Sequence, residues 1–460
     1  MFRIFNHYVP KSYFILLIIE GLMFYGSIYA GAYIRFSSLD DAIHNVGELW
    51  PRAVVYLFIF LCTMTAMGMY DRHSRDRLSY ILLRISIAFF VALMMVSLIF
   101  YIFPDLYIGR GVLSIATALA FVTVISGRCI FNRTNDTNNR RVLVLGAGRK
   151  GAMLDKLLRR KTDRRGTDIV GYVALAGEVA VNEDKVINYD GSLKKLVDQY
   201  KIDEIVMAVD ERRSSFPLDD IVDCRMQGVM VSDFLSFVER MTCKVLVNEL
   251  DPSWLLFSEG FRFNMINDGL KRALDLIISS LLLVILSPLM LIVALLILTE
   301  DRGGITFCQQ RVGFNGRVFT IYKLRSMRAD AESGEAAQWA DKEDRRVTWV
   351  GRFIRKFRID ELPQLINVIK GDMSFVGPRP ERPEFVNDLK QQIPYFIERH
   401  RVKPGITGWA QICYPYGASV QDSQAKLEYD LYYVKHYSLF LDMVIIFQTL
   451  QVVLFGKGAR

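Results

Sequence analysis

The sequence contains few cysteines, and none of them is placed to pair with another. The 460 residues include six, which lie far apart and form no Cys-x-x-Cys motif: Cys62, Cys129, Cys224, Cys243, Cys308 and Cys413. Disulfide-stapled domains and structural zinc sites need closely spaced cysteines. The sequence therefore argues against both kinds of protein, and no cysteine is a candidate nucleophile.

Four stretches within the first 135 residues are poor in charge and long. Each can cross a hydrocarbon core of about 30 Å, and they run over residues 12–34, 50–70, 79–103 and 112–131. The first is too long for a cleavable signal peptide, and another stretch follows it closely. The sequence shows no relay of intramembrane charges, which disfavours transport. We predict a four-span transmembrane bundle over residues 1–135 for anchoring or pairing, so homo-oligomerisation stays open.

Basic residues flank these stretches unevenly. On one side lie Arg3, Lys11, Arg72, Arg75, Arg77, Arg133, Arg140 and Arg141, and on the other only Arg35, Arg52 and Arg110. Cytoplasmic loops carry an excess of lysine and arginine, so the N-terminus and the chain after residue 131 are predicted to be cytoplasmic. The net charge of +8 also fits anionic lipid or phosphorylated substrates, although the loop bias alone accounts for it equally well.

A glycine-rich turn follows a short apolar run after the fourth stretch. The run at 141–145 leads into Gly146-Ala147-Gly148-Arg149-Lys150-Gly151 and then a helical pattern. This is GxGxxG between a strand and a helix, the setting in which Gly146, Gly148 and Gly151 favour a dinucleotide phosphate. We predict a Rossmann-like (CoA/NAD-binding-like) domain over 140–255, with further parallel strands at 168–175, 205–209 and 229–231.

The acidic residue that would hold a ribose is not where this motif needs it. The second predicted strand has no acid at its end, and Glu178 is the nearest candidate. We therefore favour a scaffold or regulatory module over a working nucleotide site, which stays the alternative.

Residues 276–298 form a further uncharged stretch, preceded by Lys271-Arg272. A fifth crossing would place the basic C-terminal half outside the cell, whereas Ser287-Pro288 interrupts the stretch at its middle. The proline frees the carbonyl of Val284, which the serine hydroxyl is a candidate to bond. We predict a re-entrant helix over 271–298, with both ends cytoplasmic and the basic pair anchored at the headgroups. A kinked full span is the alternative.

The stretch Arg358–Pro380 combines a helical pattern with charge. Apolar residues recur at helical spacing over 362–369, which predicts a short amphipathic helix ended by Gly371. Pro363 fits only the first turn of this helix, which places Asp360 at or beside its N-cap. On spacing alone, ordinary capping explains the acidic residues.

Arginines around this carboxylate pair favour a functional interpretation. Basic residues precede and follow it: Arg352, Arg355, Lys356, Arg358, Arg379 and Arg382. Carboxylates at a positive helix end, ringed by arginines, suit a phosphate ester bound to Mg²⁺. Asp360 and Glu361 point about 100° apart on a helix, so we expect them to have different roles.

Linked motifs give the C-terminal half a resemblance to a known family. They are Asp-Glu-Leu-Pro-Gln-Leu at 360–365, Lys-Gly-Asp-Met-Ser at 370–374, Val-Gly-Pro-Arg-Pro at 376–380, Gln-Arg-Val-Gly at 310–313, Lys-Leu-Arg-Ser-Met at 323–327 and the segment 400–411. From about Lys271 onward the chain resembles the bacterial sugar transferases. These are the monotopic phosphoglycosyl transferases, or polyprenyl glycosylphosphotransferases, that start polysaccharide synthesis.

The resemblance implies a fold and a reaction. It implies a membrane protein of mixed fold, in which a monotopic α/β catalytic domain at 265–460 follows the bundle and the Rossmann-like domain. The reaction transfers a phospho-sugar from a UDP-sugar to polyprenyl (undecaprenyl) phosphate, giving polyprenyl-diphosphate-sugar and UMP. This step initiates exopolysaccharide, capsule or O-antigen assembly at the cytoplasmic face of the bacterial inner membrane. The implied partners are these substrates and membrane lipid, and no nucleic acid.

The resemblance also assigns roles to residues. Asp360 is the expected nucleophile, Glu361 assists the transfer, and both are expected to hold Mg²⁺. The expected phosphate contacts are Lys323, Arg325, Arg352, Arg355, Arg379 and Lys403.

The chain departs from the family after Gln411. Many relatives continue with Asn-Gly-Arg-Asn, whereas this chain has Ile-Cys-Tyr-Pro-Tyr-Gly at 412–417, which bears on the nucleotide contacts and the sugar. Residues 426–455 predict a helical stretch in the membrane interface with tyrosines at headgroup level.

Two other functions remain as alternatives. A membrane nucleotide-sugar dehydratase or epimerase needs a second GxGxxG and a Tyr-x-x-x-Lys pair in residues 270–460, and the sequence has neither there. A nucleotide-sensing membrane scaffold leaves the Asp360–Pro380 motifs without a purpose.

Overall fold

The computed structural model describes most of the chain, in two compact units. It describes all residues except 1, 5–6, 10, 68, 71–77, 136–138, 160–163, 165, 176–179, 211–215, 252–264, 301–303, 329–345, 415–416, 418 and 456–460. The first unit contains residues 1–3 and 8–242, and the second contains residues 4–7 and 243–460. Residues 243–250 thus group with the C-terminal unit, although we predict the middle domain to run to 255.

Four long apolar helices hold the four predicted stretches. They are α1 (Lys11–Phe36), α3 (Leu49–Ala66), α4 (Leu78–Ile102) and α5 (Arg110–Asn135). A short sheet of β1 (Phe2–Ile4) and β2 (His7–Val9) precedes them, and α2 (Leu39–Val46) and the 3-10 turn η1 (Pro104–Leu106) lie in their connections. The helix α1 packs against α3 and α5, and α3 packs against α4. Their shared core is aromatic, with Phe60 packed between Phe24, Tyr56 and Phe89.

A buried ion pair, which the sequence did not predict, joins two of these helices. Glu20 of α1 is 1% exposed and lies 2.7 Å from the guanidinium of Arg128 of α5. Arg128 also donates to Met69 O and lies over the ring of Tyr70, whose hydroxyl donates to Glu20. A charge within an apolar helix is costly unless paired, so this contact fixes how α1 and α5 face each other.

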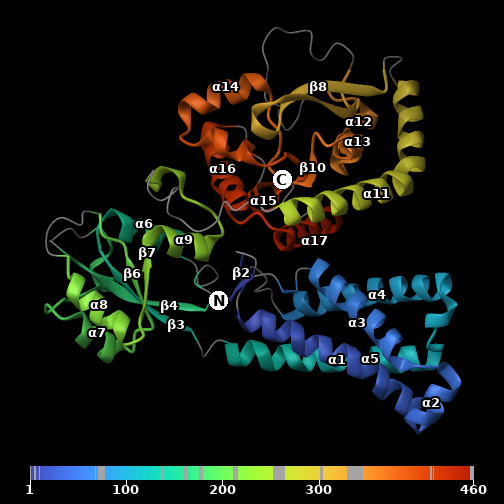
Figure 1. The fold of residues 1–460 in the computed structure, drawn as a ribbon, viewed down its shortest axis with the longest axis horizontal. Helices are drawn as coiled ribbons and strands as arrows, with labels where there is room; N and C mark the ends of the chain where they lie inside the picture. The colour runs from blue at the N-terminus through green and yellow to red at the C-terminus, as the bar shows by residue number, and fades with distance from the viewer. Residues whose placement is uncertain are drawn as a thin grey trace. The chain divides into compact units, whose positions relative to one another are not determined.

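A five-stranded parallel sheet follows, as the sequence predicts. Its strands are β3 (Arg140–Leu145), β4 (Thr167–Val173), β5 (Val186–Ile187), β6 (Glu204–Met207) and β7 (Met230–Asp233), in the order β5-β4-β3-β6-β7. Counted along the chain, this is the order 3-2-1-4-5, which matches the doubly wound dinucleotide-binding order without its sixth strand. Helices cover both faces (Figure 1): α6 (Arg149–Leu157) and α9 (Phe234–Thr242) lie on one, α7 (Leu193–Tyr200) and α8 (Leu218–Met226) on the other. The short strand β5 and the turn η2 (Glu183–Lys185) were not predicted.

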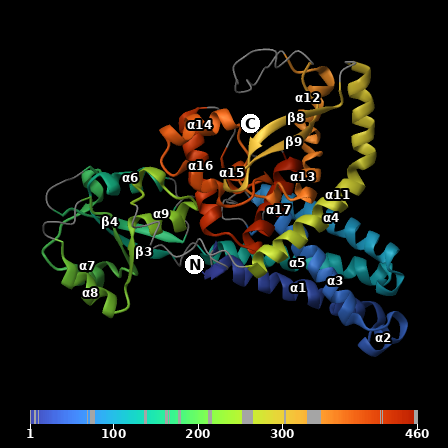
Figure 2. The same cartoon turned by 45° about the horizontal axis from the view of Figure 1, so that its top comes forward.

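The C-terminal unit begins with a long bent helix, α11 (Met265–Glu300). Figures 1 and 2 both show its two arms meeting at a sharp bend. Pro288 lies inside the helix, and the Ser287 hydroxyl donates to Val284 O at 2.8 Å, which confirms the predicted compensation for the lost hydrogen bond. By length and composition, α11 and the four N-terminal helices are the five in the described chain able to cross a membrane. The chain is therefore a membrane protein.

The first arm of α11 is tied to the rest of its unit. Lys271 is 6% exposed and lies 2.6 Å from the carboxylate of Asp442, and Arg272 donates to Val368 O and Ile369 O. Our prediction that Lys271 anchors at the headgroups is wrong, because this charge is neutralised inside the protein.

Two small sheets and a set of short helices complete this unit. The hairpin β8 (Thr306–Val312) and β9 (Val318–Leu324) is antiparallel, and β10 (Ser374–Val376) pairs in parallel with β11 (Gly405–Thr407). The helices are α12 (Trp349–Lys356), α13 (Gln364–Lys370), α14 (Pro383–Gln392), α15 (Trp409–Cys413), α16 (Val420–Lys435) and α17 (Leu439–Phe455), with 3-10 turns η3 (Val247–Glu249), η4 (Phe314–Gly316), η5 (Ile359–Glu361) and η6 (Phe396–Arg401). The helix α16 buries Tyr432 and Tyr433 completely, so these tyrosines are not at headgroup level as predicted.

Candidate active site

The Asp360 segment is a tight turn that leads into α13. Arg358 has a positive φ of 54°, a backbone conformation that non-glycine residues rarely adopt, and it starts η5 (Ile359–Glu361). Gly371 ends α13 with a φ of 97°, as predicted. Asp360 lies within η5 rather than at a helix N-cap, because Pro363 precedes α13 directly. The capping explanation for Asp360 is therefore wrong.

A buried asparagine aligns α13 with β9. The Oδ1 atom of Asn367 accepts from Tyr322 N at 3.1 Å, and its Nδ2 atom donates to Thr320 O at 2.8 Å. Asn367 is fully buried, so these bonds replace water that it cannot reach. They hold Lys323 of β9 opposite the start of α13.

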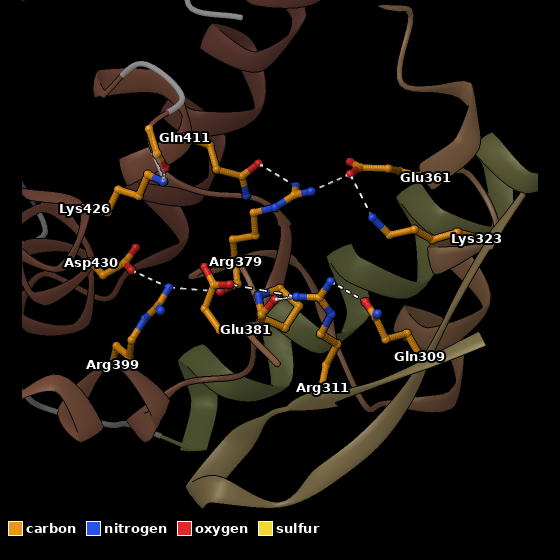
Figure 3. A network of polar contacts seen from close by, with 12 residues as sticks. Gln309, Arg311, Lys323, Glu361, Arg379, Glu381, Arg399, Gln411, Lys426 and Asp430 are labelled. Carbon is orange, nitrogen blue, oxygen red and sulfur yellow. Dashed lines mark hydrogen bonds and ion pairs between the residues drawn. The ribbon is translucent and has the colours of Figure 1, made fainter. Parts of the chain in front are cut away.

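Glu361 is the buried anion of the site (Figure 3). Its Oε1 atom lies 2.7 Å from Arg379 Nη2 and 3.4 Å from Lys323 Nζ. Burial alone would raise the pKa of this carboxyl, but Arg379 and Lys323 hold it well below its usual range. Glu361 is therefore ionised at neutral pH, and two of the predicted phosphate contacts converge on it.

Asp360 is the opposite case, a nearly buried carboxylate without a bonded partner. Its residue is 9% exposed, and within the described part of the chain its carboxylate has no hydrogen bond or ion pair. Burial and the charge of Glu361 raise the pKa of Asp360 to about 6, against the opposing effects of Lys323, Arg379 and Arg355. The two adjacent acids thus have divergent pKa values, which is typical of carboxylates with different chemical roles.

The buried Arg399 and the half-buried Arg311 fix the loop that presents Arg379. Arg399 donates to Arg379 O at 2.9 Å and pairs with Asp430 at 2.8 Å, while Arg311 donates to Pro380 O at 3.1 Å (Figure 3). Burial raises the pKa of Asp430 to about 6 despite Arg399. The family-like Arg311 therefore acts on the loop backbone, which the sequence did not indicate.

Gln411 bridges two arginines at the same site. Its Oε1 atom lies 3.3 Å from Arg358 Nη1 and 3.5 Å from Arg379 Nη1. Arg358 was predicted only as one of the basic residues around the carboxylate pair, and Gln411 was not predicted as a site residue. The motif at 400–411 contained the signal, but a neutral side chain gave no electrostatic reason to select it.

The remaining predicted phosphate contacts are dispersed. Arg355 is close enough to Asp360 to lower its pKa, whereas Arg352 is exposed on α12. Arg325 directly follows β9, where its N–H donates to Ile305 O. Lys403 lies by Gly371 and Arg272, at the end of α13 away from Asp360. The structure does not bring Lys403 to the carboxylate pair.

Asp360 and Glu361 suit a metal ion that is bound jointly by the protein and by a substrate. Among the described residues, no three histidine, cysteine or acidic side chains converge on one point. Mg²⁺ is commonly bound by one or two carboxylates together with substrate phosphates. The bonding capacity left on Asp360, next to Glu361, fits that kind of site.

At the glycine-rich turn of the middle sheet, the protein's own groups occupy the positions that a dinucleotide phosphate would take. Gly146 has a φ of 120°, and a Cβ there would meet Ala208 O at 2.3 Å. At the start of α6, the carboxylate of Asp210 accepts from Arg149 N at 2.6 Å and from Lys150 N at 3.2 Å. These N–H groups are those that a dinucleotide phosphate would need. Glu178, the candidate for the ribose, lies outside the described residues.

The segment after Gln411, where the chain departs from its relatives, is held by its own contacts. Tyr414 donates to Asp422 at 2.8 Å, and Lys426 Nζ donates to Gly417 O at 2.6 Å. Asp422 also completes a capping box with Ser419 at the start of α16.

Comparison with known proteins adds an independent line of support. Residues 266–456 match the family model described as bacterial sugar transferase. The chain is 43% identical over 240 residues to the UDP-N-acetylgalactosamine-undecaprenyl-phosphate N-acetylgalactosaminephosphotransferase of Aeromonas hydrophila, a match that covers 52% of this chain and 55% of that protein. It is 46% identical over 194 residues to the undecaprenyl-phosphate glucose phosphotransferase of Komagataeibacter xylinus, covering 41% and 36%.

A longer match includes most of a third relative. The chain is 31% identical over 331 residues to the UDP-glucose:undecaprenyl-phosphate glucose-1-phosphate transferase of Escherichia coli, which covers 69% of this chain and 68% of that protein. By contrast, the chain spans about half the length of the Aeromonas relative and about a third of the Komagataeibacter one. The predicted family is confirmed: this chain belongs to the bacterial sugar transferases.

Proposed function

We propose that this protein transfers a sugar 1-phosphate from a UDP-sugar to a polyprenyl phosphate. The products are a polyprenyl-diphosphate-sugar and UMP, and the reaction initiates polysaccharide assembly. The names of the relatives support the two substrate classes. The observation that carries the proposal is the carboxylate pair, with Asp360 unpaired and Glu361 bound by two cations.

In the first step, an Asp360 oxygen attacks the sugar-bearing phosphorus of the UDP-sugar. A new P–O bond forms to Asp360, the bond to the bridging oxygen breaks, and UMP leaves with that oxygen and its electron pair. Arg379 and Lys323 neutralise charge on the phosphate oxygens, while Glu361 orients both cations. Asp360 and Glu361 would hold Mg²⁺, which when bound supplies further neutralisation of the diphosphate.

In the second step, the polyprenyl phosphate takes the phospho-sugar from Asp360. A phosphate oxygen of the lipid attacks the same phosphorus, and the P–O bond to Asp360 breaks. The Asp360 carboxylate is restored, so the two anionic substrates use one site in turn.

The direct test of this activity is release of UMP by the purified protein in the presence of polyprenyl phosphate and Mg²⁺. The relatives' names contain different sugars, so UDP-glucose, UDP-galactose and UDP-N-acetylgalactosamine are compared. We expect turnover with one of them and dependence on the lipid acceptor. Formation of a dehydrated or epimerised nucleotide sugar would instead support the other enzyme class.

The pH profile should follow Asp360. Its pKa is raised to about 6, and only the carboxylate is a nucleophile. We therefore expect kcat/KM to be half its maximum near pH 6, to level off above about pH 7 and to fall about tenfold per pH unit below about pH 5. A profile that stays flat down to pH 4.5 in folded enzyme would contradict the assignment.

We further propose that α1, α3, α4 and α5 form a four-span bundle in the bacterial inner membrane, and that α11 is re-entrant. The basic flanks support a cytoplasmic N-terminus, and the bend at Ser287-Pro288 supports a helix that returns to its own side. The catalytic residues then face the cytoplasm, where UDP-sugars are.

Cysteine labelling tests this topology. Single cysteines at Met265 and Thr299, exposed residues near the two ends of α11, should react with a membrane-impermeant reagent only after the cells are opened. Cysteines at Arg52 and Arg110, on the predicted outer side, are the control and should react in intact cells. Labelling of Thr299 alone in intact cells would mean that α11 spans the membrane.

We propose that the middle sheet is a scaffold. The carboxylate of Asp210 at the start of α6 supports this, because an anionic ligand would have to displace it. Ala substitution at both Gly146 and Gly148 should lower the melting temperature, because Gly146 needs a positive φ and touches Ala208. Folded variant should retain most of its turnover, and NAD(H) should not change the wild-type rate. Loss of all turnover in a folded variant, with an NAD(H) effect on the wild type, would refute the scaffold.

A further inference from the structure

An apolar pocket lies between the bent helix α11 and the catalytic elements. It has a volume of about 600 Å³ and is bounded by both arms of α11, by β8 and β9, and by α13. Leu283 lies on the first arm, Met290 and Ala294 on the second, and Ile366 on α13. The bend at Pro288 brings the two arms around this space, so the break in the helix shapes the pocket.

One end of the pocket lies at the start of α13, the helix into which the Asp360 turn leads. Pro363, one of its lining residues, follows Glu361 by two positions. From there the pocket follows α13, which extends for about 10 Å over its seven residues, to Lys370. The Lys370 ammonium donates to the Tyr322 hydroxyl at 3.0 Å and lies 4.6 Å from the centre of that ring. The Lys370 ammonium group at the far end of the pocket therefore already has a hydrogen-bond partner and an aromatic ring within the protein.

The lining chemistry indicates what kind of molecule fits. Eight of the twelve lining residues are apolar, while the Ser287 hydroxyl is already bonded to Val284 O and Lys370 to the Tyr322 hydroxyl, so the lining favours an apolar molecule over a nucleotide or a sugar. Its outer wall is the same helix whose other faces are strongly exposed and apolar, with Val284 at 72% and Leu295 at 56%. An apolar chain can thus pass from surrounding lipid into the pocket without crossing water.

We propose that this pocket binds the first isoprenoid units of the lipid acceptor, with the phosphate end at Pro363, next to Asp360. The inference rests on the proposed function and extends it to a named binding site for the second substrate. It assigns α11 a part in substrate recognition as well as in membrane attachment. Specificity for a prenyl chain then follows from packing against α11 and α13.

Filling the pocket tests the proposal. Ala294→Phe places a ring into the space, and we expect KM for polyprenyl phosphate to rise roughly tenfold to a hundredfold. The KM for UDP-sugar should stay unchanged, because the carboxylate pair and its cations are not altered. Leu295→Phe, on the lipid-exposed face of the same turn, is the matched control and should leave both KM values unchanged.

A second variant guards against misfolding, and the readouts separate the two proposals. Leu283→Ala widens the pocket from the other arm, and we expect it to raise the acceptor KM roughly tenfold. If both variants keep normal KM values for both substrates, bilayer lipid fills the pocket and the inference is overturned. If the acceptor and donor KM values rise together, the pocket is not specific to the acceptor and the inference also fails. A wild-type protein that releases no UMP would instead refute the proposed function itself.

Discussion

Replacing Asp360 with asparagine is expected to lower turnover by a factor of about ten thousand or more, because the variant has no nucleophile. Asparagine has almost the same shape, and Asp360 makes no hydrogen bond or ion pair with the described residues that the change would break. The loss should therefore appear in kcat, measured as UMP release, while the protein folds normally.

The same variant should be more stable than the wild type at neutral pH. The pKa of Asp360 is raised from 3.8 to about 6, which means that the folded state disfavours the ionised form. The contribution of Asp360 to stability is thus greatest below pH 3.8, where its carboxyl is protonated in both states, and it is lost as the pH rises through about 6. At pH 7 this costs about 3 kcal/mol at most, and asparagine removes the cost. A higher melting temperature together with lost turnover would mark Asp360 as a functional rather than a structural residue.

Asp388→Asn is the matched control for this change. Asp388 is exposed on α14, so the same loss of charge there should alter neither turnover nor melting temperature. Asp360→Asn with more than a tenth of the wild-type turnover would contradict its role as nucleophile.

Replacing Glu361 with glutamine is expected to lower kcat about a hundredfold to a thousandfold, because Arg379 and Lys323 lose the anion that orients them. Unlike Asp360→Asn, this change should also destabilise the protein. The pKa of Glu361 is held well below its usual range, so its ionised form stabilises the folded state at all pH values above about 4.5. We expect a loss of about 2 kcal/mol in the free energy of unfolding. This is less than the roughly 3–5 kcal/mol lost when a fully buried pair is broken, because the Arg379 side chain is 40% exposed.

Thermal melts at pH 7 measure this contrast between neighbouring acids. Glu384→Gln, an exposed acid in the first turn of α14, is the control and should leave both turnover and melting temperature unchanged. If Glu361→Gln melts at or above the wild-type temperature, the ion pairs seen around Glu361 do not stabilise the folded protein.

The sequence predicted those features that depend on local pattern. Apolar runs located the long helices, alternation of strands and helices located the parallel sheet, and Ser287-Pro288 located the bend in α11. Motif resemblance selected Asp360 and Glu361, and the structure pairs Glu361 with the predicted Lys323 and Arg379.

The features that the sequence did not predict arise from contacts between distant segments. Lys403 sits in a family-like motif, but the length of α13 separates it from Asp360. Lys271 looked like a headgroup anchor because its partner, Asp442, is 171 residues away. Glu20 and Arg128 are 108 residues apart in the sequence, and only packing of α1 on α5 makes them a pair.

The central claim is that the phospho-sugar passes through a bond to Asp360. Intact-protein mass spectrometry after incubation with the UDP-sugar and Mg²⁺, without lipid acceptor, tests it most directly. We expect a mass increase of one phospho-sugar, which disappears when polyprenyl phosphate is added and never forms in Asp360→Asn. An active enzyme that shows no adduct, with intersecting-line kinetics for its two substrates, would contradict it and favour direct transfer between the two bound substrates.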